Sequence, residues 1–208
     1  MLEAIVLVGI PGCGKSTYAG MLKDIYGYEI VERDQIRLDM MKQKGLQSAT
    51  DTRVDFTKWD WSWEKDVTEK QYALIEEYAK QNKSLVLSDT NLKYRESLIS
   101  FLEKLGYQVK VQYLYTPLHV CLQRDLEREY PVSIDPIKRL HQEFMKQIQT
   151  EFPFEKESFM VICHSCTETS HIAWLVSSMH FVVRYVYKDI VYDVYRKHKD
   201  VIDVIIKV

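Results

Sequence analysis

The chain has 208 residues, of which 46% are hydrophobic and 28% are charged, with 28 basic against 30 acidic side chains. These proportions are those of an ordinary globular protein, and they exclude a disordered chain, a collagen-like repeat and a coiled coil. The formal net charge of −2 excludes a protein coated with basic residues for nucleic-acid binding, although it allows a local basic groove.

The cysteines and the hydropathy pattern indicate the cellular compartment in which the protein works. The four cysteines, Cys13, Cys121, Cys163 and Cys166, are too scattered for a disulfide framework and favour a reducing environment. The N-terminal residues lack the basic stretch of a secretory signal, and polar residues interrupt the most apolar late segment, 171–187. We therefore expect a cytoplasmic protein with no membrane partner.

The first 150 residues alternate strand and helix patterns. Short apolar runs predict strands at 5–8, 29–31, 85–87 and 109–115, and helical periodicity predicts helices at 16–25, 35–43, 65–81, 93–105, 118–129 and 135–148. Strands separated by helices predict an α/β fold, with a mostly parallel sheet covered by helices on both faces. We expect this domain at residues 1–155. Residues 156–208 are expected to form a small C-terminal extension, with one more strand at 159–162.

Residues 9–16 read Gly-Ile-Pro-Gly-Cys-Gly-Lys-Ser and match the phosphate-loop pattern G-x-x-x-x-G-K-[ST] between a strand and a helix. Such a loop directs backbone N–H groups and a helix N-terminus at phosphate oxygens. We expect Lys15 to reach the β- and γ-phosphates of ATP and Ser16 to hold Mg²⁺. The expected ATP contacts are Gly9, Pro11, Gly12, Cys13, Gly14, Lys15, Ser16 and Thr17. The alternative is a glycine-rich turn with an incidental lysine.

Two other segments of the sequence argue against a motor or switch ATPase and against a GTPase. The third strand is followed by Ser88-Asp89-Thr90 and not by the Asp-Glu pair of motor and switch ATPases. Asn82-Lys83 lacks the later aspartate that guanine recognition requires. A short chain with a phosphate loop and neither feature favours a small kinase.

A kinase needs a carboxylate that accepts the proton of the attacking hydroxyl. Asp34 and Asp89 follow the second and third predicted strands, at the edge of a parallel sheet where ligands bind. Each would also serve as a helix N-cap. Arg37 lies three residues after Asp34, where it would hold a neighbouring phosphate or form a surface ion pair.

Arg124 and Arg128 are four residues apart in a predicted helix, so we expect them on one face. Near a γ-phosphate they would stabilise charge in the transition state. The acidic residues between them favour a solvated face when spacing alone is considered.

Together these segments resemble the 5′-kinase domains of bacteriophage polynucleotide kinases, within the P-loop kinase group. The matching segments span residues 1–148: the phosphate loop at 9–17, Arg33-Asp34-Gln35-Ile36-Arg37, Leu-Ser-Asp-Thr-Asn-Leu at 87–92, the pair Arg124 and Arg128, and Pro-Val-Ser-Ile at 131–134. The resemblance implies a P-loop kinase fold and an ATP- and Mg²⁺-dependent kinase. Its acceptor would be the 5′-hydroxyl of DNA or RNA, in nucleic-acid repair.

The resemblance also implies residue roles. Lys15 and Ser16 would bind ATP and magnesium, and Asp34 would be the general base. Arg37 would contact the phosphate next to the hydroxyl. Asp89 would support the acceptor site by holding Arg37, with Thr90 and Asn91 beside it. Arg124 and Arg128 would be lid arginines over the ATP phosphates. The chain contains no Asp-x-Asp motif of the associated 3′-phosphatase, so we expect none of that activity.

Two other functions stay open at this point: a kinase for a small-molecule or tRNA-aminoacyl hydroxyl, and a non-catalytic ATP-binding module. The tryptophans of the segment 57–63 would either stack on acceptor bases or pack an insert onto the core. Cys163-x-x-Cys166 with His171 is a weak zinc signal. The aromatic and branched residues of the extension would form a homo-oligomer interface or pack on their own core.

Overall fold

The computed structural model describes residues 2–116, 118–150, 158–162, 183–187, 190–198 and 201–207. Its sheet has the strand order β2-β3-β1-β4-β5-β6-β7-β8. The strands are β1 (Glu3–Val8), β2 (Glu29–Val31), β3 (Leu85–Leu87), β4 (Gln108–Tyr115), β5 (Ser158–Ile162), β6 (Val183–Tyr187), β7 (Ile190–His198) and β8 (Val201–Lys207). The helices are α1 (Lys15–Tyr26), α2 (Arg33–Gln43), the 3₁₀ helix η1 (Trp61–Trp63), α3 (Glu64–Lys80), α4 (Arg95–Lys104), α5 (Leu118–Leu126) and α6 (Ile134–Thr150).

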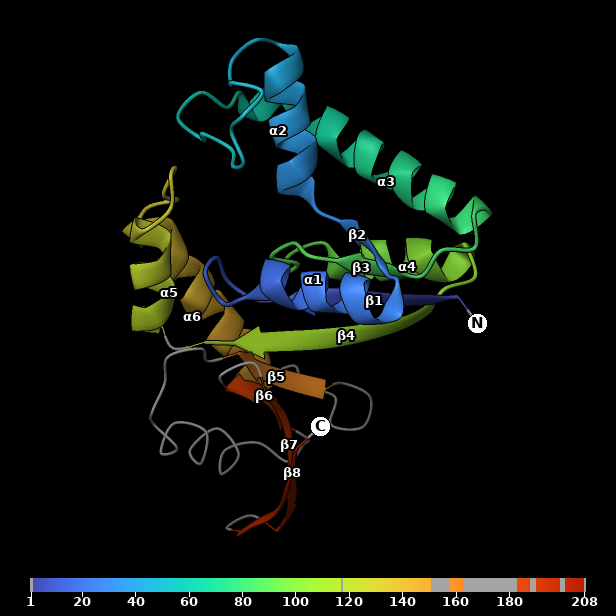
Figure 1. Cartoon of the computed structure of the whole chain (residues 1–208), viewed down its shortest axis with the longest axis vertical. Helices are drawn as coiled ribbons and strands as arrows, with labels where there is room; N and C mark the ends of the chain where they lie inside the picture. The colour runs from blue at the N-terminus through green and yellow to red at the C-terminus, as the bar shows by residue number, and fades with distance from the viewer. Residues whose placement is uncertain are drawn as a thin grey trace.

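The expected parallel sheet with helices on both faces, a P-loop kinase fold, is confirmed. Strands β2, β3, β1, β4, β5 and β6 pair in parallel, and only β7 and β8 add on antiparallel. The central strand β1 is buried from Ala4 to Val8, as a parallel strand covered on both faces must be. Figure 1 shows α1 and α4 on opposite faces, and α2 with α3 beyond the β2 edge.

The register brings the carboxyl ends of the central strands together. Val6 pairs with Leu87 of β3, and Val8 pairs with Tyr113 of β4. The loop after β1, the start of α2 and the turn after β3 therefore meet at one edge. Figure 1 shows α5 and α6 near this end of β4.

The described residues form two hydrophobic clusters. The larger one surrounds the sheet and includes β1, β3 and the inner faces of α1, α4 and α6. The smaller one joins α2, η1 and α3 around Met41, Val54, Trp59 and Val67. This second cluster fixes the segment between α2 and η1, which forms one wall of the site described below.

Several helix ends differ from the predicted bounds, including the start of α2, the end of α5 and the start of α6. Helix α2 begins at Arg33, so Asp34 lies in its first turn and is not its N-cap. Helix α5 ends at Leu126, because the N–H of Arg128 bonds to the carbonyl of Asp125 and tightens the chain into a turn. Helix α6 begins at Ile134, so Asp135 lies inside its first turn.

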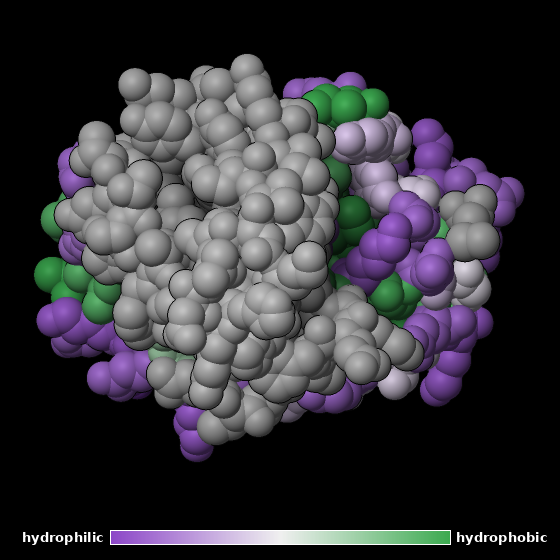
Figure 2. All heavy atoms as spheres, turned by 90° about the horizontal axis from the view of Figure 1, so that it is seen from below, coloured by the Kyte–Doolittle hydropathy of each residue, from purple (hydrophilic) through white to green (hydrophobic). Residues whose placement is uncertain are grey.

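On the face shown in Figure 2, hydrophilic residues predominate on the described surface, with smaller hydrophobic areas between them. Within the described residues, no helix is both long and apolar enough to span a bilayer.

Candidate active site

The phosphate loop joins β1 to α1, and two of its glycines, Gly9 and Gly12, have no room for a Cβ atom. A Cβ on Gly9 would lie 2.6 Å from Cys13 Sγ and 2.8 Å from the carbonyl oxygen of Leu114. A Cβ on Gly12, which has φ of +81°, would lie 2.6 Å from the carbonyl oxygen of Cys121. Cys13 itself is fully buried, as expected of a small residue that fills space. The loop is thus pressed between β4 and α5.

Lys15 begins α1 and folds over the loop. Its Nζ donates hydrogen bonds of 2.9 Å to the carbonyl oxygens of Gly9 and Ile10. The ammonium group therefore lies on the loop that a triphosphate would occupy. Phosphate oxygens would take over these bonds when a nucleotide binds.

Ser16 carries the expected magnesium ligand, and it has an acidic neighbour that the sequence analysis missed. Its Oγ donates to Oε1 of Glu32, at 3.2 Å. Burial, together with the charges of Asp89 and Asp34, raises the pKa of Glu32 to about 7. A hydroxyl and a carboxylate oxygen are hard donors of the kind that Mg²⁺ prefers, so these residues fit the ion.

The two arginines that were expected to share a helix face are separated. Arg124 lies on α5, and its Nη1 donates to the carbonyl oxygen of Gly12 at 3.0 Å. Arg128 lies beyond the end of α5 and forms an ion pair of 3.2 Å with the buried Asp125. Because the helix ends between them, Arg124 reaches the phosphate loop while Arg128 turns toward a neighbouring cavity.

That cavity has a volume of about 240 Å³. Ser16, Glu32 and Asp34 contribute oxygen atoms to it, and Arg128 contributes a cation. Its complete lining is Ser16, Glu32, Asp34, Gln35, Leu38, Thr52, Arg53, Val54, Phe56, Arg128, Tyr130 and Val132. The cavity therefore joins the phosphate loop to the first turn of α2.

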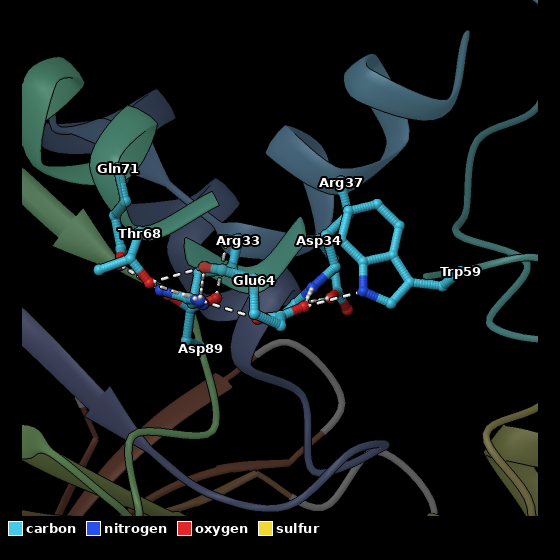
Figure 3. Close-up of polar contacts among 8 residues, drawn as sticks. All are labelled: Arg33, Asp34, Arg37, Trp59, Glu64, Thr68, Gln71 and Asp89. Carbon is cyan, nitrogen blue, oxygen red and sulfur yellow. Dashed lines mark hydrogen bonds and ion pairs between the residues drawn. The ribbon is translucent and has the colours of Figure 1, made fainter. Parts of the chain in front are cut away.

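On α2, Asp34 and Arg37 form the pair that the sequence predicted. Arg37 Nη1 donates to Oδ1 of Asp34 at 2.5 Å, and the Asp34 side chain is 54% exposed. Glu64, at the start of α3, accepts from Nε and Nη2 of the same arginine, at 2.8 Å each. Figure 3 shows Glu64 between Arg33, Arg37 and the indole of Trp59.

Glu64 is the centre of this network and was not found from the sequence. Besides Arg37, it accepts from Nη2 of Arg33 and from Nε1 of Trp59, both at 2.9 Å. Burial would raise the pKa of Glu64, but the hydrogen bonds of both arginines outweigh it and lower the pKa to about 2. The carboxylate is therefore charged at neutral pH.

Asp89 does not hold Arg37, contrary to expectation. Its Oδ1 accepts from the backbone N–H of Arg33 at 2.8 Å, and its Oδ2 accepts from Nε2 of Gln71 at 2.9 Å (Figure 3). Burial raises the pKa of Asp89 to about 6, although the bond from Arg33 opposes this. Asp89 thus attaches the start of α2 to the end of β3, and Glu64 orients Arg37.

Thr90 and Asn91 lie beside Asp89, but their described contacts are structural. The Nδ2 of Asn91 donates to the carbonyl oxygen of Leu7 at 2.8 Å, and the carbonyl of Thr90 accepts from the N–H of Gly9. Together they attach the turn after β3 to the end of β1. Their expected contact with an acceptor stays a prediction.

The tryptophans at 59–63 divide between the two expected roles. Trp59 is 5% exposed and packs in the smaller cluster, edge-on to Trp63. Trp61 is 65% exposed and lies parallel to Phe56. Trp59 and Trp63 therefore pack this segment onto the smaller cluster, whereas Trp61 keeps one ring face open to solvent.

No group of three metal-ligating side chains occurs among the described residues. Cys163, Cys166 and His171 lie outside them, as do parts of the expected oligomer interface, so both expectations stay predictions.

Comparison with known proteins places the chain in a family. A family model described as an AAA domain matches residues 5–151. A solved structure of the Pnkp1/Rnl/Hen1 RNA repair complex aligns with a TM-score of 0.57 over 89% of this chain and 70% of that one, at 12% identity.

Two curated relatives are themselves kinases named for different acceptors. One is a bifunctional polynucleotide kinase/RNA ligase of Autographa californica nuclear polyhedrosis virus, 28% identical over 72% of this chain. This chain spans 22% of the length of that relative. The other is a shikimate kinase of Clostridium botulinum, 24% identical over 82% of this chain and 93% of the relative.

Proposed function

The chain belongs to the AAA domain family on a P-loop kinase fold, and on that premise we propose that it transfers the γ-phosphoryl group of ATP to the 5′-hydroxyl of a DNA or RNA strand. One observation carries the proposal: a single cavity is lined both by Ser16, which follows the phosphate-loop lysine, and by Asp34. An acceptor hydroxyl on Asp34 would therefore face the γ-phosphate. The similarity to the viral polynucleotide kinase/RNA ligase supports this acceptor class.

On the nucleotide side, Lys15 would exchange the carbonyls of Gly9 and Ile10 for phosphate oxygens. Ser16 and Glu32 would hold Mg²⁺, which when bound neutralises charge on the β- and γ-phosphates. Arg124, already on the carbonyl of Gly12, is positioned to stabilise negative charge that spreads over the transferred group.

On the acceptor side, Asp34 would accept the hydroxyl proton while the acceptor oxygen bonds to phosphorus. The bond from phosphorus to the bridging oxygen of ADP breaks at the same time, so the products are ADP and a 5′-phosphate. Arg37 bonds to Asp34 and would contact the phosphate that follows the reacting nucleotide. Glu64 fixes the guanidinium of Arg37 for that contact.

A kinase for a small-molecule hydroxyl is the second candidate. The cavity of about 240 Å³ is small enough to favour it, and the shikimate kinase relative matches this chain over most of its length. The two candidates share the chemistry of Asp34 and Lys15 and differ in what surrounds the acceptor hydroxyl.

The test is transfer of labelled γ-phosphate from Mg²⁺-ATP to 5′-hydroxyl DNA and RNA oligonucleotides, with shikimate in parallel. We expect labelled oligonucleotide with the wild type and none with Lys15→Ala or Asp34→Asn. Asp39→Asn is the matched control, because Asp39 lies on the same helix and bonds only to Gln35 among the described residues. Labelled shikimate without labelled oligonucleotide would overturn the proposal in favour of the second candidate.

A further inference from the structure

One wall of the cavity has no role in the proposed reaction. It is formed by Thr52, Arg53, Val54 and Phe56, which belong to the segment between α2 and η1. The phosphate loop contributes no residue to this wall, and the proposed base Asp34 lies outside it, on α2. Its residues therefore face whatever is attached to the acceptor hydroxyl.

The wall is held in a fixed shape by its own contacts. Gln47 Nε2 donates to the carbonyl of Arg53 at 2.7 Å, and Gln47 Oε1 accepts from the N–H of Asp55 at 3.0 Å. Val54 is buried in the smaller hydrophobic cluster, with Phe56 packed against it. The segment is thus preorganised, which lowers the ordering cost of binding a ligand.

Arg53, which belongs to this wall, has a guanidinium group that no described carboxylate pairs with. Its side chain is exposed and makes no ion pair or hydrogen bond with any residue that the structure describes. Arg128 lines the same cavity, and burial and the charge of Arg53 both lower its pKa. Two neighbouring cations repel each other, so an anion between or beside them would be stabilised.

An aromatic pair extends from the cavity to the surface. The rings of Phe56 and Trp61 have centroids 6.0 Å apart and an interplanar angle of 12°. The guanidinium of Arg37 lies 5.9 Å from the centre of the Phe56 ring. Contacts therefore run from Asp34 through Arg37 and Phe56 to the indole of Trp61, which is 65% exposed.

We propose that the segment from Thr52 to Trp61 binds the acceptor strand, with Arg53 on a backbone phosphate and the free face of Trp61 stacked on a nucleobase. The inference rests on the proposed function and makes its acceptor a single-stranded end. A nucleic-acid strand supplies both a phosphate for Arg53 and a planar base for Trp61, and exposed aromatic rings stack on bases of any sequence. A small molecule filling the cavity would not reach Trp61.

The base contact is tested with 5′-hydroxyl oligonucleotides that carry one abasic site at each of the first four nucleotides in turn. Trp61→Ala should raise the KM for the intact oligonucleotide about 5- to 150-fold, from a stacking energy of about 1–3 kcal/mol per base. Trp61→Phe should retain most of the affinity. In the Trp61→Ala enzyme, the abasic site that weakens the wild type should have no further effect. Tyr26→Ala is the control, because Tyr26 is 69% exposed at the far end of α1.

The phosphate contact is tested by the salt dependence of oligonucleotide binding. Arg53→Ala should reduce the slope of log Kd against log salt by about 0.7, the value for one contact to a single strand. Lys65→Ala is the matched control, because Lys65 is 84% exposed on α3, outside the cavity.

The outcomes separate this inference from the proposed function. If the wild type phosphorylates no oligonucleotide, the proposed function is overturned and the inference with it. If it does, but Trp61→Ala and Arg53→Ala behave like Tyr26→Ala and Lys65→Ala, the strand-binding surface is overturned and the kinase reaction stands. An effect of one variant alone overturns the contact assigned to the other residue.

Discussion

Glu64 holds the guanidinium of Arg37 by two hydrogen bonds of 2.8 Å, on Nε and Nη2, and leaves Nη1 for Asp34. The two carboxylates therefore bind different nitrogens of the same guanidinium group. The carboxylate on α3 fixes the plane of the guanidinium, while the one on α2 stays exposed toward the cavity.

Replacing Glu64 should impair the acceptor side alone. Glu64→Gln removes the charge that orients Arg37, and a hydrogen bond to a charged group contributes about 1.5–3 kcal/mol. We expect kcat/KM for the acceptor to fall about 10- to 150-fold, with an unchanged KM for ATP. Glu69→Gln, on the exposed face of the same helix, is the control. Equal loss in both variants would contradict the role given to Glu64.

Substitutions of glycine should show that the phosphate loop lacks room for a side chain, whereas a glycine inside α1 tolerates one. Gly12→Ala puts a Cβ 2.6 Å from the carbonyl oxygen of Cys121 at a positive φ, and we expect loss of ATP binding. Gly20→Ala lies inside α1 with open space around its Cβ, so it should stabilise the fold by about 0.5–1 kcal/mol. Titration with a fluorescent ATP analogue and urea denaturation measure the two effects.

Arg124 and Arg128 should differ in their kinetics, because they lie at different parts of the site. Arg124→Ala removes the contact with Gly12 and should raise the KM for ATP and lower kcat. Arg128→Ala should mainly raise the KM for the acceptor, since Arg128 lines the cavity proposed to hold the acceptor. Steady-state kinetics with each substrate varied in turn would decide, and identical changes in both variants would contradict the separation.

Glu32 should make stability depend on pH in the metal-free protein. Its pKa is about 7 in the fold against an ordinary value of 4.5, so the folded state binds the proton more tightly than the unfolded state. The free energy of unfolding should therefore decrease as pH rises through the window from 4.5 to about 7. Glu32→Gln should lack this decrease, so the variant gains on the wild type across that window. Urea denaturation at several pH values with a chelator present measures the difference, and parallel curves would contradict it.

The sequence predicted the sheet and the phosphate loop well because both depend on local signals. The apolar run of β1 and the spacing of Gly9, Gly12, Lys15 and Ser16 determine their own structure. Asp34 was found because it follows a strand end in a parallel sheet. The same argument applied to Glu32, two residues earlier, would have found it as well.

The remaining site residues depend on long-range contacts. Glu64 lies 27 residues from Arg37 along the chain, and no local pattern indicates that pair. The separation of Arg124 from Arg128 depends on where α5 ends, and helix ends are the least predictable part of a helix pattern. Which of the three tryptophans stays exposed is decided by the packing of α2 on α3.

The smaller hydrophobic cluster is drawn entirely from one uninterrupted stretch of chain, from Ile36 to Val67. The ATP-side residues Lys15, Ser16 and Arg124 lie outside that stretch. On the proposed function, we expect that grafting this stretch from a related kinase, with the nucleotide-binding residues kept, would change the preferred acceptor. Such a chimaera should keep the hydrogen bonds that Asp89 accepts from the backbone N–H of Arg33 and from the side chain of Gln71.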